Sequence, residues 1–414
     1  MPITGSFNHK SELKSMRQKL IFFIADGMGD YPLAELEGQT PLQAAETPNL
    51  DWLAPRSVQG RCQTIPQGCP PGSDIANMSL LGFDPLEFHT GRGPIEAAAQ
   101  GLQLEAQDLI YRLNLCTVSE FSPAGRMLDY CAGHISTAQA SKILDNLRDQ
   151  LPNEHLEIVS GMQYRHLLIQ KNGQPSAESR LQINPPHDLL HKSLQSDLET
   201  YAQSPLLLEF LQSSSRLLQE SWNQSQANAL WPWGQGGPLQ LPDFQQLFQF
   251  HGAVISAVDL IKGLGRACNM QILEVPGATG LLDTNYQGKA QAALKFMNQG
   301  NFVYLHLEGP DECGHAGNIQ DKIQAIQRFD QEILGPLLPE IDHQGIACLV
   351  ACDHLTPISL RTHSNDPVPF LFYNPLKPAR NGAQAFNEKI AADTELVIEK
   401  GEDLLHWVLA DLEL

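Results

Sequence analysis

The sequence predicts an α/β protein with a mainly parallel sheet, flanked by helices, into which a second, α+β domain is inserted. Both ends of the chain alternate apolar runs of strand length with segments whose apolar residues recur at helical spacing, as in βαβ units. At 414 residues the chain is longer than one hydrophobic core usually supports. We expect the sheet-based core to comprise residues 1–88 and 250–414, and the inserted domain to comprise residues 89–249.

The first expected strand is QKLIFFIAD (18–26), whose apolar residues run on without the alternation of a half-exposed strand. TPLQAAETPNLDWLA (40–54) then predicts a helical region bounded by prolines. Three further apolar runs of strand length are NFVYLHLEG (301–309), QGIACLVACD (344–353) and PVPFLFYN (367–374). Residues 318–338 carry apolar residues at helical spacing between the first two of these runs, which completes a strand, helix, strand order.

The middle of the chain differs in composition. Residues 204–250 are rich in glutamine, but their leucines recur at helical spacing, so we expect this stretch to be folded. Within it, WPWGQGGP (231–238) carries turn signals.

The charge balance narrows the class of partner. The chain has 27 basic and 47 acidic residues, a formal charge of −20, which disfavours nucleic acid and anionic membranes as partners. The N-terminus has no apolar signal segment, and the eight cysteines form no CxxC pair. We therefore expect a cytoplasmic protein with free thiols.

Residues of metal-ligating types fall where the expected strands end. They are Asp26, Asp311, His315, Asp353 and His354, together with His363 in the loop before the last strand. In open parallel sheets, ligands bind beyond the carboxyl ends of the strands. This mixture of oxygen and nitrogen ligands suits Mn²⁺ or Zn²⁺ better than Ca²⁺, and its size favours two metals over one. Any one of these residues taken alone is equally well explained as a cap or a buried hydrogen-bonding group.

Ser73 is the candidate nucleophile. It follows Pro-Pro-Gly and precedes the helix-compatible DIANMSLLG, so it would stand at a helix N-terminus, where backbone N–H groups favour phosphoryl oxygens. A nearby divalent cation would lower the pKa of its hydroxyl. A plain N-cap serine is the alternative.

A series of motifs covers nearly the whole chain in order: DGMGD, TPLQAAETPNLDWLA, PGSDIANMSLLGFDP, TGRGPIEA, WPWGQG, SAVDLIKGLG, VPGATGLLDTNY, EGPDECGHAG and CDHLTP…RTHSNDPVPF. Together they resemble the cofactor-independent phosphoglycerate mutases of the archaeal type, within the alkaline phosphatase superfamily. The resemblance implies an alkaline-phosphatase-like core with two divalent metal ions, usually Mn²⁺ or Zn²⁺, with Mg²⁺ a further candidate. It also implies an inserted domain that binds substrate.

The resemblance further implies roles for single residues. One metal would be held by Asp26, Ser73, Asp353 and His354, and the other by Asp311, His315 and His363. Ser73 would take the phosphoryl group from 3-phosphoglycerate and return it to the other hydroxyl of glycerate, giving 2-phosphoglycerate without bisphosphoglycerate. A cleft that closes over the substrate would keep water from the phosphoserine.

The inserted domain departs from the mutases. It reads MLDYCAGHIST (127–137) where they carry an arginine-containing segment that binds substrate. With MQYRHLLI (162–169) and PPHDLL (185–190), it is more similar to a bacterial subgroup of the family proposed to act as a homoserine kinase. The candidates for the substrate surface are Arg92, Arg112, Asp129, His134, Arg165, His166, His187 and Lys262, each of which is also explained as a surface charge or a satisfied polar group.

Three activities therefore stay open. The first is the mutase, acting on a small phosphorylated hydroxy acid. The second is a phosphotransferase acting on another small hydroxylated acid such as homoserine. The third is a metal-dependent phosphomonoesterase, in which water intercepts the phosphoserine. A non-enzymatic binding module is disfavoured, because it has no need of a nucleophile among metal ligands.

Overall fold

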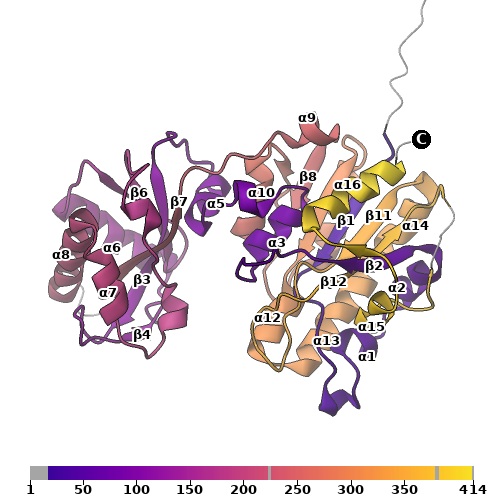
Figure 1. The fold of residues 1–414 in the computed structure, drawn as a ribbon, viewed down its shortest axis with the longest axis horizontal. Helices are drawn as coiled ribbons and strands as arrows, with labels where there is room; N and C mark the ends of the chain where they lie inside the picture. Colours follow the sequence, from indigo (N-terminus) through magenta and orange to yellow (C-terminus); the bar gives the residue numbers. More distant parts are fainter. Residues whose placement is uncertain (1–16, 222–224, 378–381, 413–414) are drawn as a thin grey trace, which may run out of the picture.

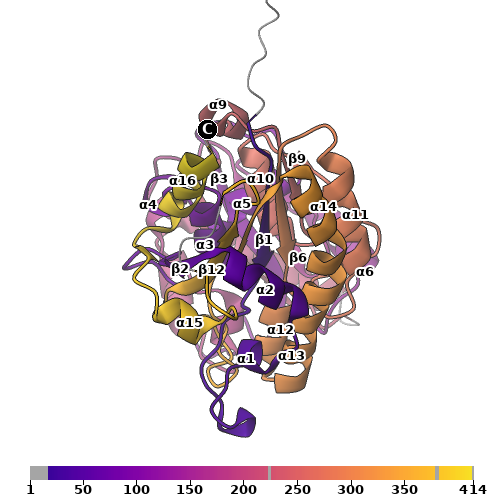
Figure 2. The same cartoon turned by 90° about the vertical axis from the view of Figure 1, so that its right-hand side faces the viewer.

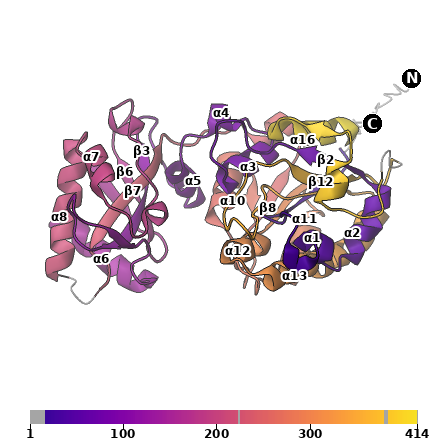
Figure 3. The same cartoon turned by 60° about the horizontal axis from the view of Figure 1, so that its bottom comes forward.

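The computed structural model describes residues 17–221, 225–377 and 382–412. Figure 1 shows two sheets in separate lobes, with helix α5 (Arg92–Ala99) between them. Figure 3 shows the same separation from another side. The two lobes have separate hydrophobic cores.

The larger lobe contains an eight-stranded sheet. In spatial order its strands are β13 (Val397–Ile398), β2 (Val58–Cys62), β12 (Val368–Tyr373), β11 (Ala347–Ala351), β1 (Leu20–Ala25), β10 (Phe302–Leu307), β8 (Gly252–Ile255) and β9 (Gln271–Ile272). β1 pairs in parallel with both β10 and β11, and β8 pairs in parallel with β10 and β9. Only β12 pairs antiparallel, with β11 and β2, among the described strands of this sheet. The expected mainly parallel α/β architecture is confirmed.

Helices cover both faces of this sheet. They are α1 (Pro41–Ala44), α2 (Pro48–Leu53), α3 (Ser73–Leu80), α4 (Pro85–Phe88), α9 (Phe244–Phe248), α10 (Asp259–Ala267), α11 (Tyr286–Phe296), α12 (Gly309–Ala316), α13 (Ile319–Arg328), α14 (Gly335–Gln344), α15 (Glu388–Ala392) and α16 (Gly401–Leu412). Figure 2 shows α11, α13 and α14 on one side of the sheet and α3 and α16 on the other. All six residues of β1 are buried, as a strand covered on both faces requires.

The smaller lobe contains a five-stranded antiparallel sheet. Its strands are β3 (Leu109–Val118), β4 (Met127–Asp129), β5 (Leu156–Val159), β6 (Arg165–Gln170) and β7 (Ala229–Gly236). Its helices are α6 (Thr137–Gln150), α7 (Gln195–Tyr201) and α8 (Pro205–Ser221). Helix α8 confirms that the glutamine-rich stretch is folded, as the helical spacing of its leucines predicted.

Two details of this lobe differ from the sequence-based expectation. WPWGQG lies in strand β7, where the sequence indicated turns. Among the described strands β7 pairs with β3 alone, so Pro232 lies on an edge strand, where its missing N–H leaves no second neighbouring strand unpaired. Phe244 and Phe248 of α9 pack into the larger core. We therefore propose that the inserted domain ends after β7 and before α9, some residues earlier than expected.

The parallel register brings distant segments to one edge. Ala25 of β1 pairs with Leu307 of β10, and Ile24 pairs with Ala351 of β11, so all three strands end together. β12 runs antiparallel to β11, so β12 begins at this edge and the loop before it lies there too. Within the described part of the chain, no helix is both long and apolar enough to cross a membrane.

Candidate active site

The residues expected at the strand ends meet at this edge of the larger sheet. Asp26 follows β1 directly, and Asp353 and His354 follow β11. All three are buried. His354 Nε2 lies 3.1 Å from Ser73 Oγ, and 3.5 Å from Asp26 Oδ1 and from Asp353 Oδ2. These four side chains form the first group of the site.

A second group lies beside the first. Asp311 and His315 are four residues apart in α12, and His363 reaches them from the loop before β12. His315 Nε2 lies 2.9 Å from His363 Nε2 and 3.3 Å from Asp311 Oδ2. Asp311 also lies within metal-sharing distance of Asp26 and His354, so it connects the two groups.

The arrangement fits divalent cations. Bonds from Zn²⁺ to nitrogen or oxygen are about 2.0–2.2 Å long, so two ligands of one tetrahedral ion lie roughly 3.4 Å apart. The separations in both groups are of this size. Asp26 Oδ1 is buried and has no hydrogen-bond partner among the described residues, which costs stability unless a proton or a cation satisfies it. The Nε2 atoms of His315 and His363 face each other at 2.9 Å, and both lie against the Asp311 carboxylate, as three ligands of one cation would.

The charges of the buried carboxylates also favour a bound cation. Burial raises the pKa of Asp26 well above its usual value, and the negative charges of Asp353 and Asp311 raise it further. Burial also raises the pKa of Glu308 to about 8. Burial alone would raise the pKa of Asp311 as well, but its contacts with His315 and His363 hold that pKa well below the usual value. The centre therefore carries crowded carboxylates that added positive charge would stabilise.

Ser73 is the first residue of α3, and Gly72 precedes it in extended conformation. The N–H groups at the start of this helix have no intrahelical acceptors, so they can bind an anion that approaches Ser73 Oγ. Asn77, one helical turn after Ser73, joins Ser73 to Asp353. Its side-chain amide donates to Asp353 Oδ2 at 2.7 Å and to the Ser73 carbonyl at 2.9 Å.

His306 belongs to the same neighbourhood, and sequence reasoning missed it. Its Nε2 lies 3.3 Å from Asp26 Oδ2, and with Asp26 and Asp353 it forms a third buried group of ligating types. Burial lowers its pKa to about 3. The available signal was a single histidine inside the otherwise apolar run FVYLHL.

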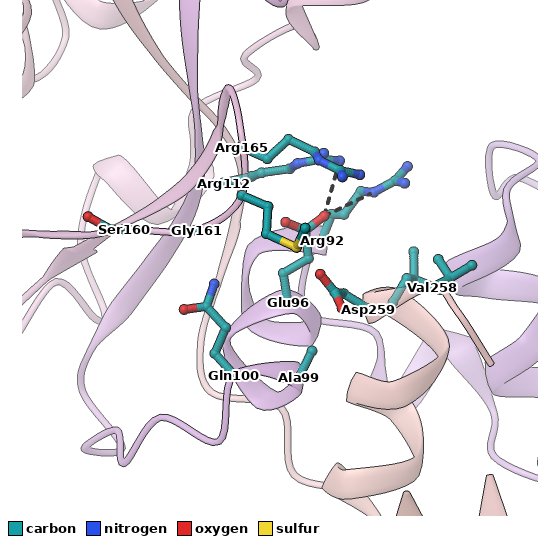
Figure 4. A pocket seen from close by; sticks show the side chains of 12 residues that line it. Arg92, Glu96, Ala99, Gln100, Arg112, Ser160, Gly161, Arg165, Val258 and Asp259 are labelled. Carbon is teal, nitrogen blue, oxygen red and sulfur yellow. Dashed lines mark ion pairs between the residues drawn. The ribbon is translucent and has the colours of Figure 1, made fainter. Parts of the chain in front are cut away.

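The smaller lobe contributes a cluster of arginines. Figure 4 shows Arg92, Arg112 and Arg165 gathered near the carboxylate of Glu96, beside a cavity of about 380 Å³ that Val258 and other core residues also line. Glu96 Oε1 lies 3.1 Å from Arg112 Nη1 and 3.9 Å from Arg92 Nε. The arginines line this cavity, and none of the strand-end residues of the site does.

Aromatic rings surround these guanidinium groups. The Arg112 guanidinium lies 5.0 Å from the centre of the Trp233 ring, and the His187 ring lies 5.4 Å from that of Trp233. Burial lowers the pKa of Arg112 to about 10, against the opposing charge of Glu96. Arg112 therefore stays positively charged at neutral pH in spite of its burial.

Across the cavity the arginines face the start of α10, where Val258 and Asp259 lie, and their charges also act on residues of α12. Burial raises the pKa of Glu312, and the charge of Arg165 opposes this rise. Burial lowers the pKa of His187, and the positive charges of Arg112 and His315 lower it further. Charged residues of the two lobes thus influence one another's pKa values.

Four of the expected substrate residues have other surroundings. Asp129 accepts hydrogen bonds from the backbone N–H groups of Cys131 and Gly133, which closes a turn. His134 is exposed on that turn. His166 is buried, accepts from a backbone N–H, and has its pKa lowered by burial to about 4. Lys262 Nζ lies 2.7 Å from Glu274.

Known proteins match this chain closely. The family model for 2,3-bisphosphoglycerate-independent phosphoglycerate mutase matches residues 54–223. The mutase of that name from Methanosarcina barkeri is 41% identical over 399 residues, which cover 94% of this chain and 98% of the relative. A probable mutase from Geobacter sulfurreducens is 38% identical over 400 residues, covering 94% of this chain and 99% of the relative.

Solved structures give the same result. A protein from Pyrococcus horikoshii superimposes with a TM-score of 0.79 at 28% identity, over 96% of this chain and 97% of the other. A cofactor-independent phosphoglycerate mutase from Thermoplasma acidophilum superimposes with a TM-score of 0.64 at 25% identity, over 95% of this chain and all of the other (100%). From its identity to the curated relatives over nearly its full length, the chain belongs to the family of 2,3-bisphosphoglycerate-independent phosphoglycerate mutases.

Proposed function

We propose that this protein interconverts 3-phosphoglycerate and 2-phosphoglycerate through a phosphoserine at Ser73, with no need of bisphosphoglycerate. The observation that carries the proposal is the position of Ser73 Oγ, at a helix N-terminus and 3.1 Å from His354 within a buried cluster of carboxylates and imidazoles. Family membership at 41% identity supports the choice of substrate.

We propose that the site binds two divalent cations, Mn²⁺ or Zn²⁺, with Mg²⁺ a further candidate. Asp26, Ser73, Asp353 and His354 would hold one, and Asp311, His315 and His363 would hold the other. Bound cations would neutralise phosphoryl oxygens and favour the ionised form of the serine hydroxyl.

Ser73 is proposed to act twice. In the first step its Oγ forms a bond to phosphorus while the bond from phosphorus to O3 of glycerate breaks. In the second step O2 of glycerate attacks the phosphoserine, and Ser73 leaves as its hydroxyl. O3 takes up the proton that Ser73 loses in the first step, and Ser73 regains the proton that O2 loses in the second step, so the net reaction neither takes up nor releases protons.

Between the two steps glycerate has to stay bound and to reorient, so that O2 takes the place of O3 beside the phosphoserine. We propose that Arg92, Arg112 and Arg165 hold its carboxylate and hydroxyls, because guanidinium groups bind carboxylates through paired hydrogen bonds. The arginines face the larger lobe across the cavity, so approach of the two lobes would both position glycerate and exclude water from the phosphoserine.

The proposal is tested with purified protein loaded with Mn²⁺, 3-phosphoglycerate and no bisphosphoglycerate. Formation of 2-phosphoglycerate is followed by coupling to enolase, and free phosphate is measured in parallel. We expect 2-phosphoglycerate without release of phosphate. Stoichiometric release of phosphate would identify a phosphomonoesterase instead. Turnover only with homoserine and an added phosphoryl donor would identify the phosphotransferase.

The Ser73→Ala variant isolates the nucleophile. It should have no mutase activity, since no oxygen remains to accept the phosphoryl group, while the other ligands still bind metal. Metal content measured by atomic emission provides the control. Near wild-type turnover in this variant would exclude a phosphoserine at position 73.

A further inference from the structure

Thr356 connects the two groups of strand-end residues. It lies three residues after Asp353, in the loop that follows β11, and it is fully buried. Its hydroxyl oxygen lies 2.5 Å from Asp311 Oδ1 and 3.2 Å from His354 Nδ1. One hydroxyl thus contacts a residue of each group.

The directions of these two hydrogen bonds follow from the chemistry of the partners. An ionised carboxylate can only accept, so the Thr356 hydroxyl donates its single proton to Asp311 Oδ1. The hydroxyl then has only lone pairs left for His354, and Nδ1 of that ring has to donate. In a neutral imidazole only one nitrogen carries a proton, which leaves Nε2 of His354 with a free lone pair.

That lone pair points to the reactive centre. His354 Nε2 is the atom that lies 3.1 Å from Ser73 Oγ and 3.5 Å from Asp26 Oδ1. The same hydroxyl holds Oδ1 of Asp311, whose other oxygen, Oδ2, faces His315 at 3.3 Å.

The fold leaves Thr356 little freedom. Lys322 Nζ donates to its carbonyl at 2.8 Å, and its own N–H donates to the Gly29 carbonyl at 3.3 Å. A Cβ at Gly27 would lie 2.5 Å from its hydroxyl oxygen, and a Cβ at Gly314 would lie 2.9 Å from its methyl carbon. Two glycines therefore make the space in which the side chain sits.

We propose that Thr356 is a positioning residue of the active site: its hydroxyl sets the tautomer of His354 and the orientation of Asp311, and so prepares both groups to bind cations. The inference rests on the proposed function insofar as these residues are metal ligands. Partners that orient ligating histidines and carboxylates commonly change metal affinity by about 10- to 100-fold when they are removed.

The experiment compares Thr356→Val, which keeps the shape and removes the hydroxyl, with Thr356→Ser, which keeps the hydroxyl and removes the methyl. Binding of Mn²⁺ to each metal-free protein is titrated by electron paramagnetic resonance of the free ion, and circular dichroism checks the fold. We expect Thr356→Val to bind Mn²⁺ about 10- to 100-fold more weakly and Thr356→Ser to bind as wild type does. Equal binding by Thr356→Val, or equal weakening in both variants, would overturn the inference.

A second readout does not depend on metal. In metal-free protein labelled with ¹⁵N-histidine, nitrogen chemical shifts report the tautomer of His354, whose signal is assigned by its loss in His354→Asn. We expect the proton on Nδ1 in wild type and in Thr356→Ser. A proton on Nε2 in wild type would overturn the inference even if Thr356→Val did not fold. If wild type bound no Mn²⁺ or Zn²⁺ while this tautomer was observed, the proposed function and the link to cation binding would fail, and only the role of the hydroxyl in setting the tautomer would stand.

Discussion

Replacing Lys322 by methionine should destabilise the larger lobe strongly. Lys322 lies in α13, and neither its side chain nor that of its partner Asp30 is exposed at all. Its ammonium group donates to Asp30 Oδ2 at 2.7 Å, to the Thr356 carbonyl at 2.8 Å and to the Gly29 carbonyl at 3.1 Å. One cation thus joins the loop after β1 to the loop after β11.

The magnitude follows from what the variant leaves behind. Methionine fills a similar volume but donates no hydrogen bond, so the Asp30 carboxylate and the two carbonyls lose their shared donor. Asp30 keeps backbone donors from Tyr31 at 2.8 Å and Ile358 at 3.2 Å, which limits the loss. Removing one partner of a buried pair typically costs about 3–5 kcal/mol, and we expect a decrease of that size in the free energy of unfolding.

Urea unfolding measures the change, with hydrogen exchange of the β1 amides to follow the larger core separately from the smaller one. The matched control is Lys295→Met, at an exposed position near the C-terminal end of α11, for which we expect a change within about 0.5 kcal/mol. A loss below about 1 kcal/mol in Lys322→Met would show that the buried pair does not hold the two loops together, and would refute the reasoning.

Three further outcomes follow from the structure. Arg165→Ala should raise KM for phosphoglycerate by about 10- to 100-fold, because a charged hydrogen bond to substrate is worth about 1.5–3 kcal/mol. It should cost little stability, because Arg165 is exposed in the free protein. An unchanged KM would show that Arg165 does not bind the substrate. Chelation should abolish turnover and lower the thermal midpoint, and added Mn²⁺ or Zn²⁺ should restore both, since a ligand bound only by the folded state stabilises it; an unchanged midpoint in fully stripped protein would contradict this. Burial tends to raise the pKa of Asp129, but hydrogen bonds from Cys131 and Gly133 outweigh it and hold the pKa below the usual value of an aspartic acid. The stabilisation from Asp129 is therefore complete above about pH 4 and is lost as the pH falls through the pKa of the folded state. In urea unfolding from pH 3 to pH 7, the difference in stability between wild type and Asp129→Asn should therefore shrink in acid. A difference that does not depend on pH would contradict the assignment.

Local patterns determined much of this protein. Apolar runs of strand length marked β1, β10, β11 and β12, because strands buried on both faces need continuous apolar sequence. The polar residues that end them predicted a shared site, since parallel strands bring their carboxyl ends to one edge. Asp26, Asp311 and His354 were found this way, and the structure places them within metal-sharing distance of one another.

Tertiary structure decided the rest. Proline and glycine made WPWGQG look like a turn, and only its position at the edge of the smaller sheet makes it a strand. The sequence did not show which residues His306 and Thr356 contact, because their partners lie on other elements. The arginine cluster, too, joins α5, β3 and β6 from separate parts of the sequence. Which side chain meets which across such distances depends on how the elements pack, and packing is a property of the whole fold rather than of any short segment.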